Sequence, residues 1–526
     1  MRPRGRSSYC SGRGHFGQVA VNVFSETADP KQGVATAEGG GVRDVAVVIT
    51  AAVLPLVLHP SRSLHFDEAF AAHVAGLPWT GWLAFLVRHD AHPPLFYALL
   101  KAWTAVLGDS AVALRGLSAV CGGGAVAATI RLGRAALGGQ AGMVAGAILA
   151  VSPLYLYTAA EARMYPLLVA LFALAAAEVL TLWNRNAGFP WLLALALTGL
   201  LYTHYLGVGL VAALAAGALW SGGRAALARY AAALAVAGAA FLPWVPILLG
   251  HVADGRMTPP WRGSLPPDAI LGVVHLIGFG GRTLGAGGYY FLASASLPMQ
   301  VLLAAPVVAL LALGAATSAR ANEVFFRLAT AAVGIPAAAL FAASLWTGSF
   351  VAYPRYFSFA MPFVAVALAS VVASGVTARR LPGAVLAGLF GVVLALSLGS
   401  LADFSARPTR GAGDWKAAAA FLESRIRPGD VVAVYPRHTE VPLGYYLPGD
   451  RAAWVVLPTD RQDPRATEAA EATDRLAVAF DRVWLVTRWP IPPGGFEATL
   501  RRASRTHRVA EFGDFEDVRI TLFTRR

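Results

Sequence analysis

The sequence predicts an all-α polytopic membrane protein of about 11 transmembrane helices, followed by a small α/β domain outside the membrane. Hydrophobic residues make up 56% of the 526 residues and charged residues only 14%, whereas soluble domains carry about 25% charged residues. Apolar runs of roughly 17 to 25 residues, each able to cross about 30 Å of hydrocarbon, recur between residues 42 and 400. From residue 401 the pattern changes to short alternating segments, which indicates a second domain.

The N-terminal tail, residues 1–41, is polar, Gly-rich and basic at its start. It has no apolar segment like the core of a signal peptide. We expect a disordered cytoplasmic tail, although a mis-assigned start codon would give the same pattern. The two cysteines are Cys10, in this tail, and Cys121, in an apolar run. Neither a disulfide framework nor a cysteine metal site is therefore expected.

The membrane domain, residues 42–400, contains about eleven apolar runs that could cross the bilayer. They lie near residues 42–58, 111–130, 139–158, 165–183, 189–205, 206–220, 230–250, 298–316, 325–346, 356–376 and 382–400. A twelfth candidate, His92 to Leu107, is short, begins with His-Pro-Pro and contains Lys101. Counting this run as a span would reverse the side of every loop that follows it.

The basic residues decide against a twelfth span, because short cytoplasmic loops collect Arg and Lys. Without it, the basic tail and five groups of arginines fall on one side: Arg131 and Arg134, Arg185, Arg224 and Arg229, Arg320 and Arg327, and Arg379 and Arg380. Residues 92–107 are then an interfacial or re-entrant helix, with Trp103 at the headgroup level and Lys101 snorkelling. This helix lies within a structured first outer loop, residues 59–110.

The same distribution explains the net charge of +13 and the pI of about 10.1. The arginines are spread between apolar runs and do not form one basic patch, so no nucleic-acid partner is expected. The topology predicts a multi-pass protein of the plasma membrane, with its N-terminus cytoplasmic and its C-terminal domain extracytoplasmic.

The C-terminal domain, residues 401–526, alternates predicted helices and strands, which is typical of a small α/β domain. The predicted helices span Asp414–Arg425, Ala466–Phe480 and Glu497–Thr506, and the predicted strands span Val431–Tyr435, Ala453–Leu457, Val483–Thr487 and Val518–Phe523. The domain lacks a G-x-G-x-x-G fingerprint. A dinucleotide site is therefore not expected there.

An acidic pair, Asp67 and Glu68, lies just beyond the first apolar run. A carboxylate that is partly desolvated beside lipid would have a raised pKa, which suits a base that activates a hydroxyl or amine acceptor. The alternative is a solvated helix cap with Asp67 as the N-cap residue, since Asp is a preferred cap. From the pair alone, both interpretations stay open.

Polar residues also precede Pro93-Pro94, which begin the next predicted helix. His89, Asp90 and His92 would be held at its N-terminal end, where backbone amides and the helix dipole favour an anion such as a lipid phosphate. A polar loop at the headgroup level is one alternative. A divalent metal site is another, because His89 and His92 have His-x-x-His spacing.

Five further residues lie in loops that the predicted topology places on the same outer side: Glu161, Arg163, Tyr165, His204 and Arg355. Arg suits bidentate contact with a phosphate. Ionisable groups near membrane depth are costly and are candidates for function, although any single one could belong to a structural pair. We therefore expect these five residues to bind substrate or lipid phosphate together with His92.

The chain resembles the integral-membrane glycosyltransferases of the C superfamily (GT-C), in the branch of the protein O-mannosyltransferases and aminoarabinose transferases. The matching residues are Asp67-Glu68, His92-Pro93-Pro94-Leu95, Arg115, Glu161 to Tyr165, Thr203 to Tyr205 and Arg355 to Phe357, and the resemblance covers roughly residues 42–400. It resembles bacterial relatives described as mannosyltransferases.

The resemblance implies transfer of a sugar, mannose or another hexose or pentose, from a polyprenyl-phosphate donor to an acceptor on the outer face, with inversion at the anomeric carbon. Asp67 would be the acceptor-activating base and Glu68 would support it. His92 would lie near the donor phosphate, with Arg163 and Arg355 as further candidates. The resemblance implies no required cofactor, and it leaves a divalent metal as an alternative.

The sequence departs from the eukaryotic members in two respects. Phe96-Tyr97 stands where those proteins have a Lys soon after His-Pro-Pro-Leu, and an α/β tail replaces their luminal β-domain. Both departures favour an envelope glycan or glycolipid over a protein acceptor. The alternative functions are a transporter or flippase of a lipid-linked precursor, which usually shows repeated halves, and a non-catalytic assembly scaffold.

Overall fold

The computed structural model describes residues 30–58, 62–183, 188–256, 265–266, 268–280, 295–348, 351–373, 383–406, 413–447, 452–457, 472, 475–476, 478–488 and 507–526. Met1–Arg43 and Asp44–Arg526 form separate compact units. All candidate site residues belong to the second unit. The predicted disordered tail falls on the first unit, and residues 1–29 of it lie outside the described residues.

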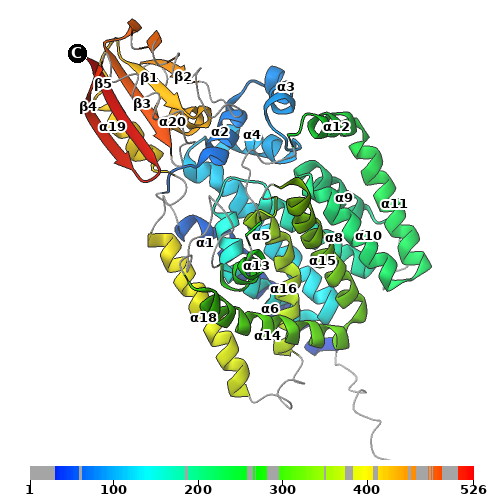
Figure 1. Cartoon of the computed structure of the whole chain (residues 1–526). Helices are drawn as coiled ribbons and strands as arrows, with labels where there is room; N and C mark the ends of the chain where they lie inside the picture. Colours follow the sequence, from blue (N-terminus) through cyan, green and yellow to red (C-terminus); the bar gives the residue numbers. More distant parts are fainter. Residues whose placement is uncertain are drawn as a thin grey trace, which may run out of the picture. The chain divides into compact units, whose positions relative to one another are not determined.

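Helices make up the described part of the membrane domain (Figure 1). Their bounds are α1 (Pro30–Leu58), α5 (Ala111–Leu137), α6 (Gly139–Val151), α7 (Pro153–Ala159), α8 (Tyr165–Thr181), α9 (Trp191–Thr203), α10 (Leu206–Ser221), α11 (Arg224–Phe241), α12 (Val245–Ala253), α13 (Ala269–Phe279), α14 (Leu297–Ala321), α15 (Glu323–Thr347), α16 (Met361–Ala373) and α18 (Gly383–Ala406). Two 3-10 turns interrupt them, η1 (Leu242–Trp244) and η2 (Pro354–Ala360).

Seven of the described helices are long and apolar enough to cross a membrane, or eight if the pair α6 and α7, bent by 64°, is one span. The chain is therefore a multi-pass membrane protein. Each of the predicted apolar runs coincides with a helix or a helix pair. However, α8, α9 and α10 have only 17, 13 and 16 residues, less than the roughly 20 that a perpendicular span needs.

Small residues allow the central helices to approach closely. A Cβ on Gly133 of α5 would lie 2.8 Å from the Cα of Gly142 on α6, and a Cβ on Gly142 would lie 2.6 Å from the carbonyl oxygen of Ile130. Such contacts are typical of helix packing in membranes, where backbones approach at glycine. They hold α5 in place, and the N-terminal end of α5 supplies an arginine to the site described below.

Three short helices form the described part of the loop between α1 and α5, here called the first loop (residues 59–110). They are α2 (Phe66–Gly76), α3 (Trp79–His89) and α4 (Leu95–Leu107). The helix predicted at 92–107 is thus present as α4, and its placement at the membrane interface stays a prediction. Trp103 donates its indole N–H to the carbonyl of Ala113, 2.8 Å away.

The prediction that Lys101 snorkels is wrong. Its side chain is buried, and its ammonium donates to the carbonyls of Ala75, at 3.0 Å, and Leu77. The ammonium also lies 4.8 Å from the centroid of the Trp79 ring. Because the last carbonyls of a helix lack intrahelical partners and carry partial negative charge, Lys101 caps the C-terminus of α2.

The C-terminal domain contains a five-stranded sheet in the order β2-β1-β3-β5-β4. The strands are β1 (Val431–Tyr435), β2 (Ala453–Val456), β3 (Arg482–Arg488), β4 (His507–Phe515) and β5 (Val518–Arg525), and the helical segments are α19 (Trp415–Glu423), η3 (Arg437–Thr439) and α20 (Glu440–Tyr446). Strand β1 is parallel to β2 and β3, whereas β5 is antiparallel to β3 and β4.

The structure confirms four predicted strands and the first predicted helix of this domain. The sequence did not predict β4 or α20. The predicted helix Glu497–Thr506 and most of Ala466–Phe480 lie outside the described residues. Helix α20 packs against α2 of the first loop (Figure 1), so this domain contacts the segment that carries the acidic pair.

Candidate active site

The acidic pair lies in the first turn of α2, where His65 is the N-cap residue. His65 Nδ1 accepts the backbone N–H of Asp67 at 3.0 Å, and the Glu68 carboxylate accepts the backbone N–H of His65 at 3.2 Å. These bonds satisfy amides that the helix itself leaves unpaired. The alternative in which Asp67 is the N-cap is therefore wrong, and its carboxylate is free for other contacts.

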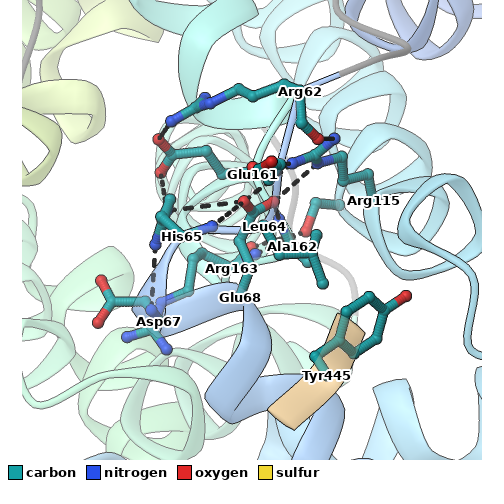
Figure 2. Close-up of polar contacts among 12 residues, drawn as sticks. Arg62, Leu64, His65, Asp67, Glu68, Arg115, Glu161, Ala162, Arg163 and Tyr445 are labelled. Atoms are coloured by element: carbon teal, nitrogen blue, oxygen red, sulfur yellow. Dashed lines mark hydrogen bonds and ion pairs between the residues drawn. The ribbon is translucent and has the colours of Figure 1, made fainter. Parts of the chain in front are cut away.

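Glu68 is fully buried and forms a two-point ion pair with Arg115 of α5 (Figure 2). Arg115 Nε lies 2.8 Å from Oε1 of Glu68, and Nη2 lies 3.0 Å from Oε2. Oε1 also accepts the backbone N–H of Ala162 at 3.0 Å. Burial alone would raise the pKa of Glu68, but Arg115 holds it well below its usual range. Glu68 thus joins α2, α5 and the loop after α7, and it positions its neighbour.

The segment before α2 is held from two sides. Arg115 donates to the carbonyls of Arg62 and Ser63, at 2.9 and 3.2 Å. The C-terminal domain supplies the other contacts: the Ser63 hydroxyl donates to Asp414 at 3.0 Å, and the Tyr446 hydroxyl accepts the backbone N–H of Leu64 at 2.9 Å. The backbone leading to Asp67 is therefore fixed by both domains.

The Asp67 carboxylate is 28% exposed, and its Oδ2 lies 3.0 Å from Nη1 of Arg355 in η2. The raised pKa predicted for Asp67 is wrong. Burial does act to raise the pKa, but Arg163 and Arg355 outweigh it and hold the pKa well below the usual range. Asp67 is therefore an ionised, accessible carboxylate between two guanidinium groups.

Arg355 also reaches the loop between α7 and α8, here called the second loop (residues 160–164). Its Nη1 lies 3.6 Å from Oε2 of Glu161. Its guanidinium carbon lies 4.8 Å from the ring centroid of Tyr353 and 5.5 Å from that of Tyr165. The aromatic rings pack on the guanidinium faces, which leaves its N–H groups directed at carboxylates.

Glu161 is a second buried anion of the site, beside Glu68. Its carboxylate lies 3.5 Å from Nη2 of Arg62 and 3.6 Å from Nε2 of His65, contacts that Figure 2 shows as dashed lines. Burial would raise the pKa of Glu161, but its contacts with His65, Arg62 and Arg355 lower it to about 2. The second loop is thereby anchored to both ends of the segment that leads into α2.

His92 begins a chain of hydrogen bonds that ends at Arg163. His92 Nδ1 donates to Asp90 at 2.8 Å, Tyr97 donates its hydroxyl proton to the other oxygen of Asp90 at 2.5 Å, and Arg163 Nη1 donates to the Tyr97 oxygen at 3.2 Å. Burial acts against ionisation of Asp90, yet His92 and Arg163 lower its pKa to about 2. Arg163 is buried, and its Nε has no partner among the described residues.

His204, which follows α9, completes the cluster. Its ring lies 5.0 Å from that of His92, 5.8 Å from that of Tyr165 and 5.3 Å from that of Tyr356, centroid to centroid. Nδ1 accepts the backbone N–H of Leu206 at 3.0 Å, so the proton of the neutral ring is on Nε2. That buried Nε2 has no partner within the described part of the chain.

The described residues include no group of three or more His, Cys, Asp or Glu side chains placed to hold a metal ion. His89 does not lie beside His92 in a shared site. Its ring stacks on Phe85, at 4.3 Å between centroids, and its Nδ1 contacts the Phe85 carbonyl at 3.1 Å. The His-x-x-His spacing therefore does not bring these two histidines together in this structure.

The structure brings together all eight site residues that the sequence singled out: Asp67, Glu68, His92, Glu161, Arg163, Tyr165, His204 and Arg355. Sequence reasoning did not find three others that bind directly to them: Arg62, His65 and Tyr97. His65 could have been recognised as a candidate N-cap residue, because it lies two positions before Asp67 at the start of a predicted helix. Arg62 and Tyr97 gave no such signal, because each contacts a site residue of the distant second loop, Glu161 for Arg62 and Arg163 for Tyr97.

Solved structures similar to this chain cover almost all of it. ArnT from Cupriavidus metallidurans bound to undecaprenyl phosphate has 16% sequence identity and a TM-score of 0.56, covering 92% of this chain and 98% of that chain. The apo form of the same protein has 15% sequence identity and a TM-score of 0.57, covering 93% of this chain and 98% of that chain. A third similar structure is the archaeal oligosaccharyltransferase AglB from Archaeoglobus fulgidus in complex with an inhibitory peptide and a dolichol-phosphate. It has 12% sequence identity and a TM-score of 0.52, covering 90% of this chain and 74% of that chain.

The chain has the GT-C fold. The family model described as dolichyl-phosphate-mannose-protein mannosyltransferase matches residues 91–249, and the family of that model is part of the GT-C superfamily. The matched stretch runs from just before α4 into α12 and contains five of the eight predicted site residues: His92, Glu161, Arg163, Tyr165 and His204. No curated protein sequence matches the chain.

Proposed function

We propose that this protein is a glycosyltransferase that moves a sugar from a polyprenyl-phosphate-linked donor to a cell-envelope acceptor at the outer face of the membrane. One observation carries the proposal. Asp67 presents an ionised, partly exposed carboxylate 3.0 Å from Arg355, next to the buried Arg163. A base for the acceptor and cations for a phosphate leaving group thus lie within one site on a GT-C fold.

The arginines would bind the phosphate of the sugar donor. A lipid phosphate that leaves a sugar takes on negative charge, which positioned N–H donors stabilise. Nε of Arg163 and Nε2 of His204 are buried donors without partners among the described residues, so a phosphate oxygen could satisfy them. The related ArnT structure holds undecaprenyl phosphate, which supports the same class of donor lipid here.

Asp67 would act as the base for the acceptor hydroxyl. The acceptor hydroxyl oxygen would bond to the anomeric carbon as its proton passes to Asp67, while the bond from that carbon to the phosphate oxygen breaks with both electrons going to the phosphate. Attack from the face opposite the phosphate inverts the anomeric centre. Arg355 pairs with Asp67 in this structure. A bound phosphate would compete for Arg355 and release Asp67 to act as the base.

We further propose that the sugar is mannose or another hexose or pentose, and that the acceptor is an envelope glycan or glycolipid. The description of the matching family model supports mannose. Phe96-Tyr97 stands where the eukaryotic members have a Lys soon after His-Pro-Pro-Leu, and this departure supports a different acceptor from theirs. In this chain the cation beside that position is Arg163, 3.2 Å from the Tyr97 hydroxyl.

The Asp67→Asn variant tests the proposal. Membranes containing the wild-type protein should transfer radiolabelled sugar from at least one of a panel of polyprenyl-phosphate sugars. The variant should express equally well and transfer none above background, because an amide cannot accept the proton. The matched control is Asp254→Asn, which changes an exposed aspartate paired with Arg256 at 3.1 Å and should leave transfer unchanged. Full activity of Asp67→Asn would overturn the assignment.

A further inference from the structure

Asp67 and three residues around it, His65, Glu161 and Arg355, form a closed ring of contacts. His65 Nδ1 accepts the Asp67 amide at 3.0 Å, and Asp67 Oδ2 lies 3.0 Å from Arg355 Nη1. The same Nη1 lies 3.6 Å from Glu161 Oε2, and this oxygen lies 3.6 Å from His65 Nε2. Figure 2 shows His65 between Asp67 and Glu161, with a dashed line to each. Each of the two nitrogens of the His65 ring therefore has a different partner.

The hydrogen bond at Nδ1 fixes the tautomer of His65. An Nδ1 that accepts a backbone N–H carries no proton itself, so the single proton of the neutral ring lies on Nε2. This N–H faces two carboxylates, with Glu161 Oε2 at 3.6 Å and Glu68 Oε2 at 4.0 Å. The ring thus links a helix amide on one side to buried anions on the other.

Capping alone does not explain a histidine at this position. Ser, Thr, Asp and Asn are the preferred N-cap residues, since a short side chain with one oxygen suffices to accept a free amide. Two other N-cap residues that cap through their side chains follow that pattern: Ser110 accepts the Ala113 amide at 3.2 Å and Asn322 accepts the Phe325 amide at 2.9 Å. What His65 adds is a second nitrogen that reaches the second loop.

We propose that His65 is a positioning residue that sets the place of Asp67 relative to Glu161 and Arg355. The inference rests on the proposed function of Asp67 as the base. If a phosphate takes Arg355 from Asp67, one side of the ring opens, and His65 remains the link between the first turn of α2 and Glu161. Asp67 then keeps its place when it has to accept the proton.

Two substitutions at His65 separate capping from positioning. His65→Asn keeps an oxygen that can cap the Asp67 amide but is too short to reach Glu161, whereas His65→Ala removes both functions. Ser110→Ala, which removes the cap of α5 only, is the control for a simple loss of a cap. The full-length proteins in detergent are compared for kcat and KM of sugar transfer, for binding of undecaprenyl phosphate, and for amide hydrogen exchange in the first turn of α2.

We expect His65→Asn to lower kcat by about 10- to 100-fold, since a misplacement of about 1 Å can have that effect. KM for the donor and the Kd for undecaprenyl phosphate should stay within about twofold of wild type. Glu161→Gln should lower kcat by a similar factor, and the double variant should be no worse than either single one, because both break the same link. Ser110→Ala should leave kcat unchanged.

Two results would overturn the role of His65: a wild-type kcat in His65→Asn, or an equal loss of kcat and of lipid phosphate binding, which would show general disruption. Hydrogen exchange gives a readout that does not depend on activity. The Asp67 amide should exchange faster in His65→Ala but not in His65→Asn, and unchanged exchange in His65→Ala would contradict the contact itself. Absence of transfer by wild type from every donor would instead count against the proposed function.

Discussion

Asp67 Oδ2 lies 3.0 Å from Nη1 of Arg355, so the first turn of α2 is paired with the 3-10 turn that precedes α16. This contact places a carboxylate from the start of the chain beside a cation from the last third of it. Together with Arg163, this contact keeps the pKa of Asp67 low although burial acts to raise it, so the carboxylate stays ionised. The neighbouring carboxylate, Glu68, has a different task, because Arg115 occupies both of its oxygens.

Replacement of Arg355 tests this pairing. Arg355→Gln should weaken binding of undecaprenyl phosphate by about tenfold or more, because a hydrogen bond to a charged group contributes about 1.5 to 3 kcal/mol. It should also let the pKa of Asp67 rise, since Arg355 is one of the cations that lower it. Binding to the purified protein measures the first effect. Arg425→Gln, which removes an exposed arginine paired with Glu511, should bind the lipid like wild type.

The Glu68 and Arg115 pair should contribute to folding. Glu68→Gln leaves the buried Arg115 without its counter-ion and is expected to destabilise the protein by about 3 to 5 kcal/mol, a typical cost for breaking a buried pair. Loss of the folded fraction on heating in detergent measures this. The double variant Glu68→Gln with Arg115→Met should be less destabilised than the sum of the single changes. Full additivity would show that the two side chains do not interact.

The carboxylates of the site determine how stability should vary with pH. Asp90 and Glu161 have pKa values lowered to about 2, from ordinary values of 3.8 and 4.5. A group whose pKa is lower in the folded state stabilises that state fully above its unfolded pKa, and the effect is lost as pH falls through the folded pKa. The melting temperature should therefore vary little between about pH 5 and 8 and fall steeply below about pH 4.

The pH dependence of sugar transfer should agree with this picture. Asp67 also has a lowered pKa, so it stays ionised in the same range, and the rate should not fall on the acid side because of this residue. A rate that declined below an apparent pKa of about 6, with that pKa shifted in Asp67→Glu, would show that the pKa of Asp67 is raised and contradict its lowered pKa.

The C-terminal domain should affect the site through Tyr446. Tyr446→Phe removes the acceptor of the buried Leu64 amide, and an unsatisfied buried amide costs about 1 to 3 kcal/mol. Thermal stability and kcat should both decrease. Its neighbour provides the control, because Tyr445 donates to the carbonyl of Asp109 at an exposed position. Tyr445→Phe should change stability by less than about 1 kcal/mol and leave kcat unchanged.

The predicted orientation can be tested with topology reporters. A reporter fused after residue 108 should report the extracytoplasmic side, because the arginine-rich loops are expected in the cytoplasm. A second reporter after residue 137, at the other end of α5, should report the cytoplasm. Because contacts join the first loop to Glu161 and Arg355, the opposite pair of signals would place the whole candidate site on the cytoplasmic side and contradict the predicted orientation.

The sequence by itself determined the class of the fold, because hydrophobic run length and strand alternation are local properties. It identified α4 as a separate short helix, the strand β1 with its observed bounds, and the acidic pair as a candidate site. It did not predict β4 or α20. Only His507 of the nine residues of β4 is buried, so the strand shows no apolar face in the sequence, and α20 is a short helix that packs on α2.

Only the tertiary structure decided what each acid does. Asp67 and Glu68 are neighbours with similar side chains. No local pattern indicates that Glu68 is buried against Arg115 whereas Asp67 pairs with Arg355 and stays partly exposed. The sequence predicted a raised pKa for Asp67 instead of a lowered one for the same reason. Burial can be anticipated from a nearby apolar run, but the opposing Coulomb energy depends on the distance to charges that other loops contribute.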